Sequence, residues 1–96
     1  MNLKNEINDS LFEAILNLET VDECYKFFID LCTVKEIESM ATRLEAAKLL
    51  KKGMTYDEIL KKVDISTATL SRVSRALKYG EGGYDEIIEK TIENKK

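Results

Sequence analysis

Three Thr-x-x-Glu patterns mark the starts of helices in this sequence, at Thr20–Glu23, Thr33–Glu36 and Thr55–Glu58. In such a capping box the Thr hydroxyl accepts from an amide of the first turn, and the Glu carboxylate reaches back to the amide of the Thr. The chain has no proline and only 4 glycines in 96 residues, so little in it interrupts a helix. No run of strand length alternates apolar and polar residues, and the sequence therefore predicts an all-α fold.

Cap and stop signals divide the chain into about six helices. Asp9 or Ser10 is the expected cap of the first helix, and Ser66 is the expected cap of the fifth. Gly53 is expected to stop the third helix in a left-handed conformation, and Gly80 is expected to end the fifth. After the first helix, the expected ranges are residues 21–32, 34–52, 56–63, 67–79 and 84–94.

The helix expected over residues 21–32 is apolar on nearly every side. A helix of this kind must be buried nearly all round, and 96 residues supply little core for it. We therefore expect a homodimer whose N-terminal helices bury against the second subunit. The alternative is a monomer in which the first helix covers Phe27 and Ile29. The apolar residues of the second helix are Val21, Cys24, Tyr25, Phe27, Phe28, Ile29 and Leu31.

Composition excludes several kinds of site and compartment. The chain has no His, which excludes His-based acid–base catalysis, and its two cysteines fall short of a zinc ligand set. Cys24 and Cys32 lie about 12 Å apart along one helix, too far for a disulfide, so free thiols in a reducing compartment are expected. No apolar run approaches the ~20 residues of a membrane span, and no signal peptide is evident. We expect a cytoplasmic protein that is not an enzyme and binds neither metal nor membrane.

The charge is unevenly distributed along the chain. The formal net charge of -3 argues against a nucleic-acid partner when it is taken as a total. Residues 43–78, however, hold nine basic side chains against four acidic ones, whereas residues 1–42 hold three basic against nine acidic. This asymmetry favours a basic face that meets a polyanion, and the alternative is a solvated helical surface with scattered lysines.

Residues 55–75 carry the pattern of a helix-turn-helix. Ile59 and Val63 form the inward face of the first helix, and Ile65 is the apolar plug of the turn. The second helix turns Leu70 and its neighbours inward and presents small polar and basic residues on the other side, as a helix that enters the DNA major groove does. The residues predicted to bind DNA are Thr55, Tyr56, Ser66, Thr67, Ala68, Thr69, Ser71, Arg72, Arg75 and Lys78.

Residues 33–79, TVKEIESMATRLEAAKLLKKGMTYDEILKKVDISTATLSRVSRALKY, resemble the Trp repressor superfamily, specifically its stand-alone YerC/YecD-type relatives. The resemblance implies an intertwined, all-helical homodimer built from a single domain over residues 1–96. Within that domain, residues 1–54 are expected to form the dimerisation helices, residues 55–79 the helix-turn-helix and residues 80–96 the C-terminal helix.

The resemblance also raises the question of an L-tryptophan corepressor. Arg43, Arg72 and Thr33 match residues that hold tryptophan in the repressor. Val73 stands where the repressor has a Gly that leaves space for the indole, and Ala76 replaces a Ser that receives the amino group. These two departures argue against tryptophan, and the two arginines can instead bind phosphate or pair with nearby acids.

Two functions follow from these features. The first is a sequence-specific transcriptional regulator, a repressor, that binds double-stranded DNA as a homodimer. The alternative is a helical protein-interaction module without DNA binding. The acidic flanks favour the alternative, as do Asp57 and Leu60, which stand where the repressor has basic residues.

Overall fold

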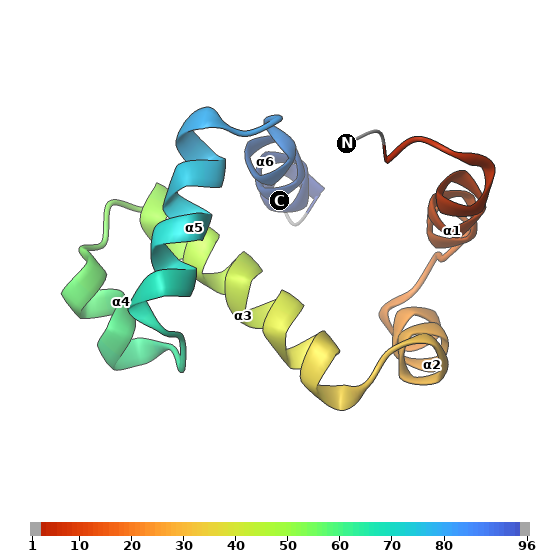
Figure 1. Cartoon of the computed structure of the whole chain (residues 1–96), viewed down its shortest axis with the longest axis horizontal. Coiled ribbons are helices and arrows are strands. Elements are labelled where there is room, and N and C mark those ends of the chain that lie inside the picture. The colour runs from red at the N-terminus through yellow and green to blue at the C-terminus, as the bar shows by residue number, and fades with distance from the viewer. Residues whose placement is uncertain (1–2, 95–96) are drawn as a thin grey trace. The chain divides into compact units, whose positions relative to one another are not determined.

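The computed structural model describes residues 3–94, and this range folds into six α-helices without a β-strand (Figure 1). The chain divides into two compact units, an N-terminal unit that ends at Ile37 and a C-terminal unit that begins at Glu38. The all-α prediction is confirmed. Each expected helix after the first agrees with the observed one to within one residue at either end.

Helix α1 (Glu6–Leu16) begins earlier than the sequence indicated. Neither Asp9 nor Ser10 caps it, which corrects that expectation. Asn5 is the cap, and its side chain accepts a hydrogen bond from the Asn8 amide at 2.8 Å. Asn, Asp and Ser are nearly equal as N-caps, so residue type alone does not choose among the polar residues of this segment.

The Thr-x-x-Glu patterns begin three of the next helices, α2 (Val21–Leu31), α3 (Val34–Lys51) and α4 (Tyr56–Lys62). The Thr33 and Thr55 boxes are reciprocal, because each Thr amide donates to the carboxylate of the Glu three residues later. The Thr20 hydroxyl also accepts from its N3 amide, but the Glu23 carboxylate accepts from the amide of Glu19 instead. The predicted boxes are therefore confirmed at two sites and shifted by one residue at the third.

The apolar core lies entirely in the C-terminal unit. Helix α5 (Thr67–Tyr79) crosses the C-terminal half of α3, with α4 and α6 (Gly83–Asn94) beside it (Figure 1). Helices α1 and α2 contain no buried residue, and Cys24 and Cys32 are half-buried free thiols. None of the helices in residues 3–94 is long and apolar enough to cross a membrane. The buried apolar residues are Ala46, Ala47, Leu49, Ile59, Leu70, Val73 and Ile88.

Two of the glycines end helices by different means. Gly53 has φ 89°, the left-handed conformation that the sequence predicted for the end of α3. Gly80 has an ordinary φ of -84°, and its amide donates to the carbonyl oxygen of Ala76 at 2.9 Å. A Cβ atom at position 80 would lie 2.4 Å from that same oxygen. Gly80 is therefore required by close packing, whereas Gly53 is required by backbone conformation.

Candidate nucleic-acid interface

Helices α4 and α5 are held together by the inward side chains that the sequence predicted. Ile59 of α4 and Leu70 of α5 are fully buried, and Val73 is 2% exposed. Val63 and Ile65, at the end of α4 and in the turn, pack against this core as half-buried residues. Because one side of α5 is fixed in the core, its opposite side faces solvent in a defined direction.

The solvent-facing side of α5 carries most of the predicted DNA-binding residues. Residues 68, 71, 72 and 75 follow the i, i+3, i+4, i+7 spacing that places side chains on one face of a helix. Arg72 and Arg75 are exposed, and neither side chain has an ion pair with a carboxylate of residues 3–94. The residues on this face are Thr67, Ala68, Ser71, Arg72, Arg75 and Lys78, all of them exposed.

Two predicted residues instead hold the start of α5 in place. The Ser66 hydroxyl accepts from the Thr69 amide at 3.1 Å and donates to the Thr69 hydroxyl oxygen at 2.9 Å. Thr69 is half-buried, so it lies at the margin of the exposed face. An N-cap of this type contributes about 1 kcal/mol to helix stability. Ser66 and Thr69 therefore order the N-terminal end of α5.

The start of α4 already holds a negative charge of its own. The Glu58 carboxylate accepts hydrogen bonds from the amide and the hydroxyl of Thr55, each at 3.0 Å. These bonds, the amide bond foremost, keep the pKa of Glu58 below its ordinary value. The Thr55 amide is therefore engaged, and the exposed Tyr56 side chain is the freer of the two residues predicted here.

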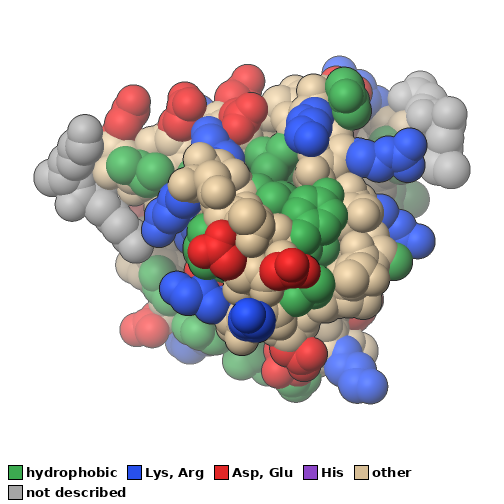
Figure 2. Space-filling model, turned by 90° about the vertical axis from the view of Figure 1, so that its left-hand side faces the viewer, with side chains coloured by type: hydrophobic (Ala, Val, Ile, Leu, Met, Phe, Trp, Pro, Cys, Tyr) green, Lys and Arg blue, Asp and Glu red, His purple; other side chains and the backbone are tan. Residues whose placement is uncertain are grey.

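Tyr56 shares a shallow groove with Lys78, the last basic residue of α5. The groove encloses about 310 Å³, and its apolar wall includes Met54 and Leu77. The structure thus brings together two predicted residues that are 22 positions apart in the sequence. Figure 2 shows this side of the molecule, where Lys and Arg side chains surround an exposed hydrophobic strip and some Asp and Glu side chains intervene.

The positive charge of residues 43–78 is not all available to a partner. Lys51 of α3 lies 2.9 Å from Asp85 and 3.6 Å from Glu89, both on α6. The hydrogen bond that Lys51 donates to Asp85 raises the pKa of Lys51 above its ordinary value. Sequence reasoning missed these two interactions, because residues 34 and 38 positions apart leave no local signal. The cations of α4 and α5 themselves are Lys61, Lys62, Arg72, Arg75 and Lys78.

Two of the three residues that match the tryptophan site, Thr33 and Arg43, form hydrogen bonds with nearby residues. The Thr33 amide donates to Glu36 in the capping box, and Arg43 Nε donates to the backbone oxygen of Ser39 at 3.3 Å. Val73 fills space in the core of the C-terminal unit. The side chains of Arg43 and Arg72 are both exposed, and the hydrogen bond of Arg43 stays within its own helix.

Comparison with known proteins gives consistent matches over most of the chain. The family model described as Trp repressor protein matches residues 6–92. The protein YerC of Bacillus subtilis (strain 168) is 46% identical over 91 residues, which cover 95% of this chain and 88% of YerC.

Two solved structures share the fold. The first is a Trp-repressor candidate from Staphylococcus aureus, with a TM-score of 0.90 and 48% identity over 93% of this chain and 89% of that one. The second is a TrpR-like protein from Eubacterium eligens ATCC 27750, with the same score and identity over 93% of this chain and 92% of that one.

Proposed function

The chain belongs to the Trp repressor family, a regulatory and non-enzymatic family, and from this premise we propose that it is a sequence-specific DNA-binding transcriptional regulator. It acts as a repressor in the cytoplasm, and it binds double-stranded DNA as a homodimer. The observation that carries the proposal is the exposed face of α5, a helix fixed in the core, whose two arginines form no ion pair within residues 3–94.

In the proposed complex, α5 enters the major groove with its N-terminal end first. Thr67, Ala68 and Ser71 meet base edges or the thymine methyl group, and Arg72 forms paired hydrogen bonds with guanine. Arg75 and Lys78 lie further along the helix, where it leaves the groove for the phosphate backbone. Ser66 and Thr69 act through the cap that orders the helix start.

In the proposed complex, Tyr56 and Thr55 at the start of α4 contact a phosphate of the DNA backbone that flanks the major groove. Tyr56 and Lys78 both line one groove, and in the proposed complex the Tyr56 hydroxyl and the Lys78 ammonium donate to the same phosphate group. The Glu58 carboxylate beside Thr55 weakens the attraction of the helix terminus itself for an anion. Tyr56 and Lys78 therefore carry more of this interaction than Thr55.

The homodimer is supported by the state of the N-terminal helices. No residue of α1 or α2 is buried, and large apolar side chains such as Val21, Tyr25 and Ile29 remain exposed. In the proposed organisation the dimerisation helices lie within residues 1–54, residues 55–79 read DNA, and the C-terminal helix lies within residues 80–96, with residues 1–2 and 95–96 outside the described range. The two recognition helices then meet half-sites about 34–36 Å apart, one turn of the DNA helix.

Selection from a random DNA pool, followed by fluorescence anisotropy on the enriched site, tests this function. We expect Arg72→Ala to weaken binding about 5- to 150-fold, since paired hydrogen bonds to guanine contribute about 1–3 kcal/mol. Arg75→Ala should lower the slope of log affinity against log salt by about 0.9 for each phosphate that is no longer neutralised. Lys90→Ala, which removes a cation of α6 outside this face, is the matched control and should change neither quantity.

The alternative function is a protein-interaction module without DNA binding. Asp57 and Glu58 in the first turn of α4 favour it, because they place carboxylates beside the proposed phosphate position. No enriched DNA at low salt, together with capture of one stoichiometric protein partner, would establish the alternative. L-tryptophan remains outside the proposed mechanism, and calorimetric titration with tryptophan tests it directly.

A further inference from the structure

The buried hydroxyl of Ser74 in α5 has no hydrogen-bond partner within the described part of the chain. Ser74 is 7% exposed, and its side chain bonds to no residue of the range 3–94. The hydroxyl oxygen is not sealed from solvent, since no fully enclosed side-chain N or O atom in this range lacks a partner. Buried hydroxyl groups are normally hydrogen-bonded. The Ser74 hydroxyl is therefore a group that a bound molecule can satisfy.

Ser74 lies in the wall of the groove that also holds Tyr56 and Lys78. The groove encloses about 310 Å³, at the lower end of the ~300–1,000 Å³ that is typical of small-molecule sites. Ser74, Leu77 and Lys78 follow the i, i+3, i+4 spacing of one face of α5. The other lining residues come from α3, from the start of α4 and the loop before it, and from α6, and they are Leu50, Lys51, Met54, Tyr56 and Asp85.

The groove offers one cation that no carboxylate of residues 3–94 neutralises. Lys51 lies 2.9 Å from Asp85 and 3.6 Å from Glu89, so its charge is already paired. Lys78 has no ion pair in the same range. Residues spaced i, i+4 are neighbours on a helix surface, so the Ser74 hydroxyl and the Lys78 ammonium can donate to one anionic group. The groove therefore favours a ligand with a single negative charge.

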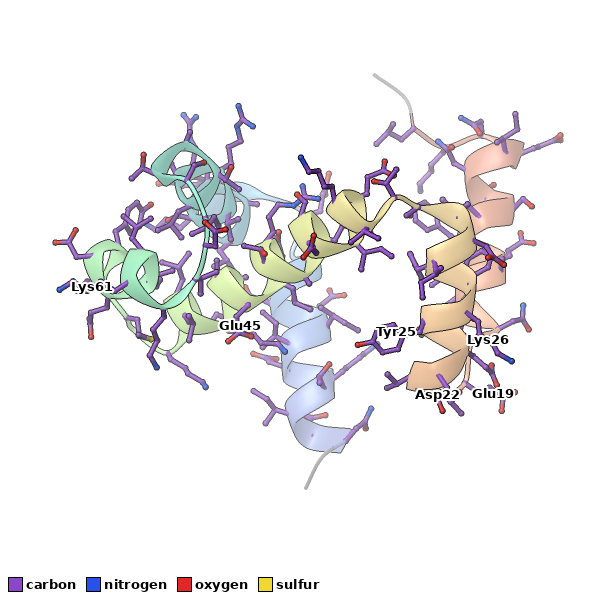
Figure 3. All side chains as sticks on the ribbon, turned by 90° about the horizontal axis from the view of Figure 1, so that it is seen from below. Glu19, Asp22, Tyr25, Lys26, Glu45 and Lys61 are labelled. Atoms are coloured by element: carbon purple, nitrogen blue, oxygen red, sulfur yellow. The ribbon has the colours of Figure 1, made fainter. Side chains whose placement is uncertain are left out.

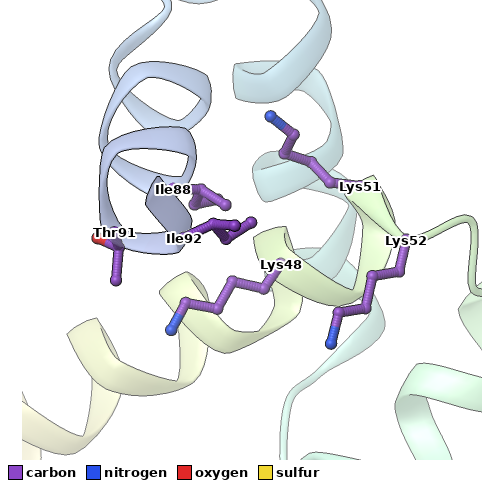
Figure 4. Close-up of a pocket in the computed structure, with 6 residues that line it drawn as sticks. All are labelled: Lys48, Lys51, Lys52, Ile88, Thr91 and Ile92. Atoms are coloured by element: carbon purple, nitrogen blue, oxygen red, sulfur yellow. The ribbon is translucent and has the colours of Figure 1, made fainter. Parts of the chain in front are cut away.

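A second groove, between α3 and α6, has a different composition (Figure 4). It shares Lys51, whose side chain turns away from Lys48 and Lys52 in this view. The hydroxyl group that lines it belongs to Thr91, which already donates to the backbone oxygen of Ile87 at 2.7 Å. Its described lining thus supplies cations and apolar side chains but no buried polar group that awaits a partner. The unpaired hydroxyl singles out the groove beside Ser74.

We propose that the groove beside Ser74 binds a small organic carboxylate with an apolar body. The carboxylate accepts hydrogen bonds from the Ser74 hydroxyl and the Lys78 ammonium. The apolar body packs against Met54, Leu77 and the ring of Tyr56, all of which line the groove. A few convergent polar groups on an apolar wall are the usual composition of such a site.

The ligand and DNA compete for the same donors. Tyr56 and Lys78 are the proposed contacts of the flanking phosphate, so a carboxylate held there displaces the phosphate group. Bound ligand then lowers the DNA affinity, and bound DNA lowers the ligand affinity by the same factor. This regulation rests on the proposed function, whereas the ligand site does not. The groove excludes Thr33, Arg43 and Arg72, the residues that match the tryptophan site.

Titration of the full-length chain with sodium phenylacetate tests the ligand site. In proton–nitrogen correlation NMR spectra, we expect the amide signals of Ser74 and Lys78 to shift with added phenylacetate. Sodium acetate supplies the charge without the ring, and phenylacetamide supplies the ring without the charge. Each should bind at least about 10-fold more weakly, because each lacks one half of the interaction. Unshifted signals at both amides, or equal binding of phenylacetamide, would overturn the proposal.

Ser74→Ala removes the unpaired hydroxyl and should weaken phenylacetate binding roughly 10-fold, since that hydroxyl donates to a charged group. Ser39→Ala is the matched control, because it makes the same change at an exposed position of α3 outside the groove. It should leave phenylacetate binding unchanged. Equal affinities of Ser74→Ala and the wild-type chain would contradict the proposal. If Ser74→Ala fails to fold, the comparison of the three ligands on the wild-type chain still decides.

Fluorescence anisotropy on the enriched DNA tests the competition separately. Equal concentrations of sodium phenylacetate and sodium acetate screen charges alike, so the ratio of the DNA dissociation constants in the two salts removes the general effect of salt. At saturating phenylacetate we expect this ratio to reach about 5-fold or more in the wild-type chain and to approach unity in Ser74→Ala. A ratio of unity in the wild-type chain would overturn the competition.

The two measurements together distinguish this inference from the proposed function. DNA binding without phenylacetate in the groove would overturn the inference and leave the regulator intact. Phenylacetate bound at Ser74 in a chain that binds no DNA would support the ligand site and overturn the regulator.

Discussion

Helices α2 and α5 begin with the same kind of N-cap hydrogen bond, yet they differ in how far they are buried. Thr20 and Ser66 each accept a hydrogen bond from the N3 amide of their own helix. Helix α5 buries Leu70 and Val73, whereas α2 buries nothing and leaves the side chain of Tyr25 exposed (Figure 3). Capping is a local property of the sequence, but burial needs a second surface. The helices of the N-terminal unit are fully formed, but α1 and α2 bury no side chain of their own.

Removing apolar volume from each unit gives the largest expected contrast. Leu70→Ala should lower the free energy of unfolding by about 2–5 kcal/mol, because it leaves a cavity in the core. Ile29→Ala removes a side chain that is 61% exposed, so its cost should come from the partner subunit. Urea unfolding at two protein concentrations measures both effects. If the destabilisation by Ile29→Ala is the same at both protein concentrations, the N-terminal helices do not bury against a second copy.

The caps should show a smaller effect that is alike in the two units. Thr20→Ala and Thr55→Ala each remove a side chain that accepts from the N3 amide, and each should cost about 1 kcal/mol. Thr91→Ala is the control, because the Thr91 hydroxyl donates to a carbonyl within α6 and caps nothing. The same urea series measures all three variants. A cost confined to Thr55→Ala would mean that helix starts depend on the core after all.

The smallest expected effect is a change of stability with pH. Hydrogen bonds from Thr33 and Thr55 lower the pKa of Glu36 and Glu58, one carboxyl in each unit. A carboxyl with a lowered folded pKa stabilises the fold above its unfolded pKa of about 4.3, and this contribution is lost as the pH falls through the folded pKa. The urea midpoint should therefore fall below about pH 4.3, and Glu36→Gln or Glu58→Gln should each flatten that fall. Unchanged slopes in both variants would contradict the role of the boxes.

Local signals predicted the helices of this chain well, and they predicted the exposed face of α5. The spacing of Leu70 and Val73 identifies the buried side of α5, so the opposite side follows from helix geometry. The expected start of α1 was wrong, because several adjacent polar residues make equivalent caps. No local sequence pattern predicted the interactions between segments that lie far apart in the chain. Examples are the ion pair of Lys51 with Asp85 and the groove shared by Tyr56 and Lys78.

The short segment after α5 constrains the sequence more tightly than the exposed face of α5 does. Any side chain at position 80 would bring its Cβ to within 2.4 Å of the Ala76 carbonyl oxygen, and a backbone atom cannot yield cheaply. Substitutions of the exposed α5 residues leave the core intact, and under the proposed function they would change the preferred operator, whereas a Cβ atom at position 80 forces the backbone to shift. If the proposed function holds, related chains can diverge in the DNA that they bind and still keep glycine at the junction between α5 and α6.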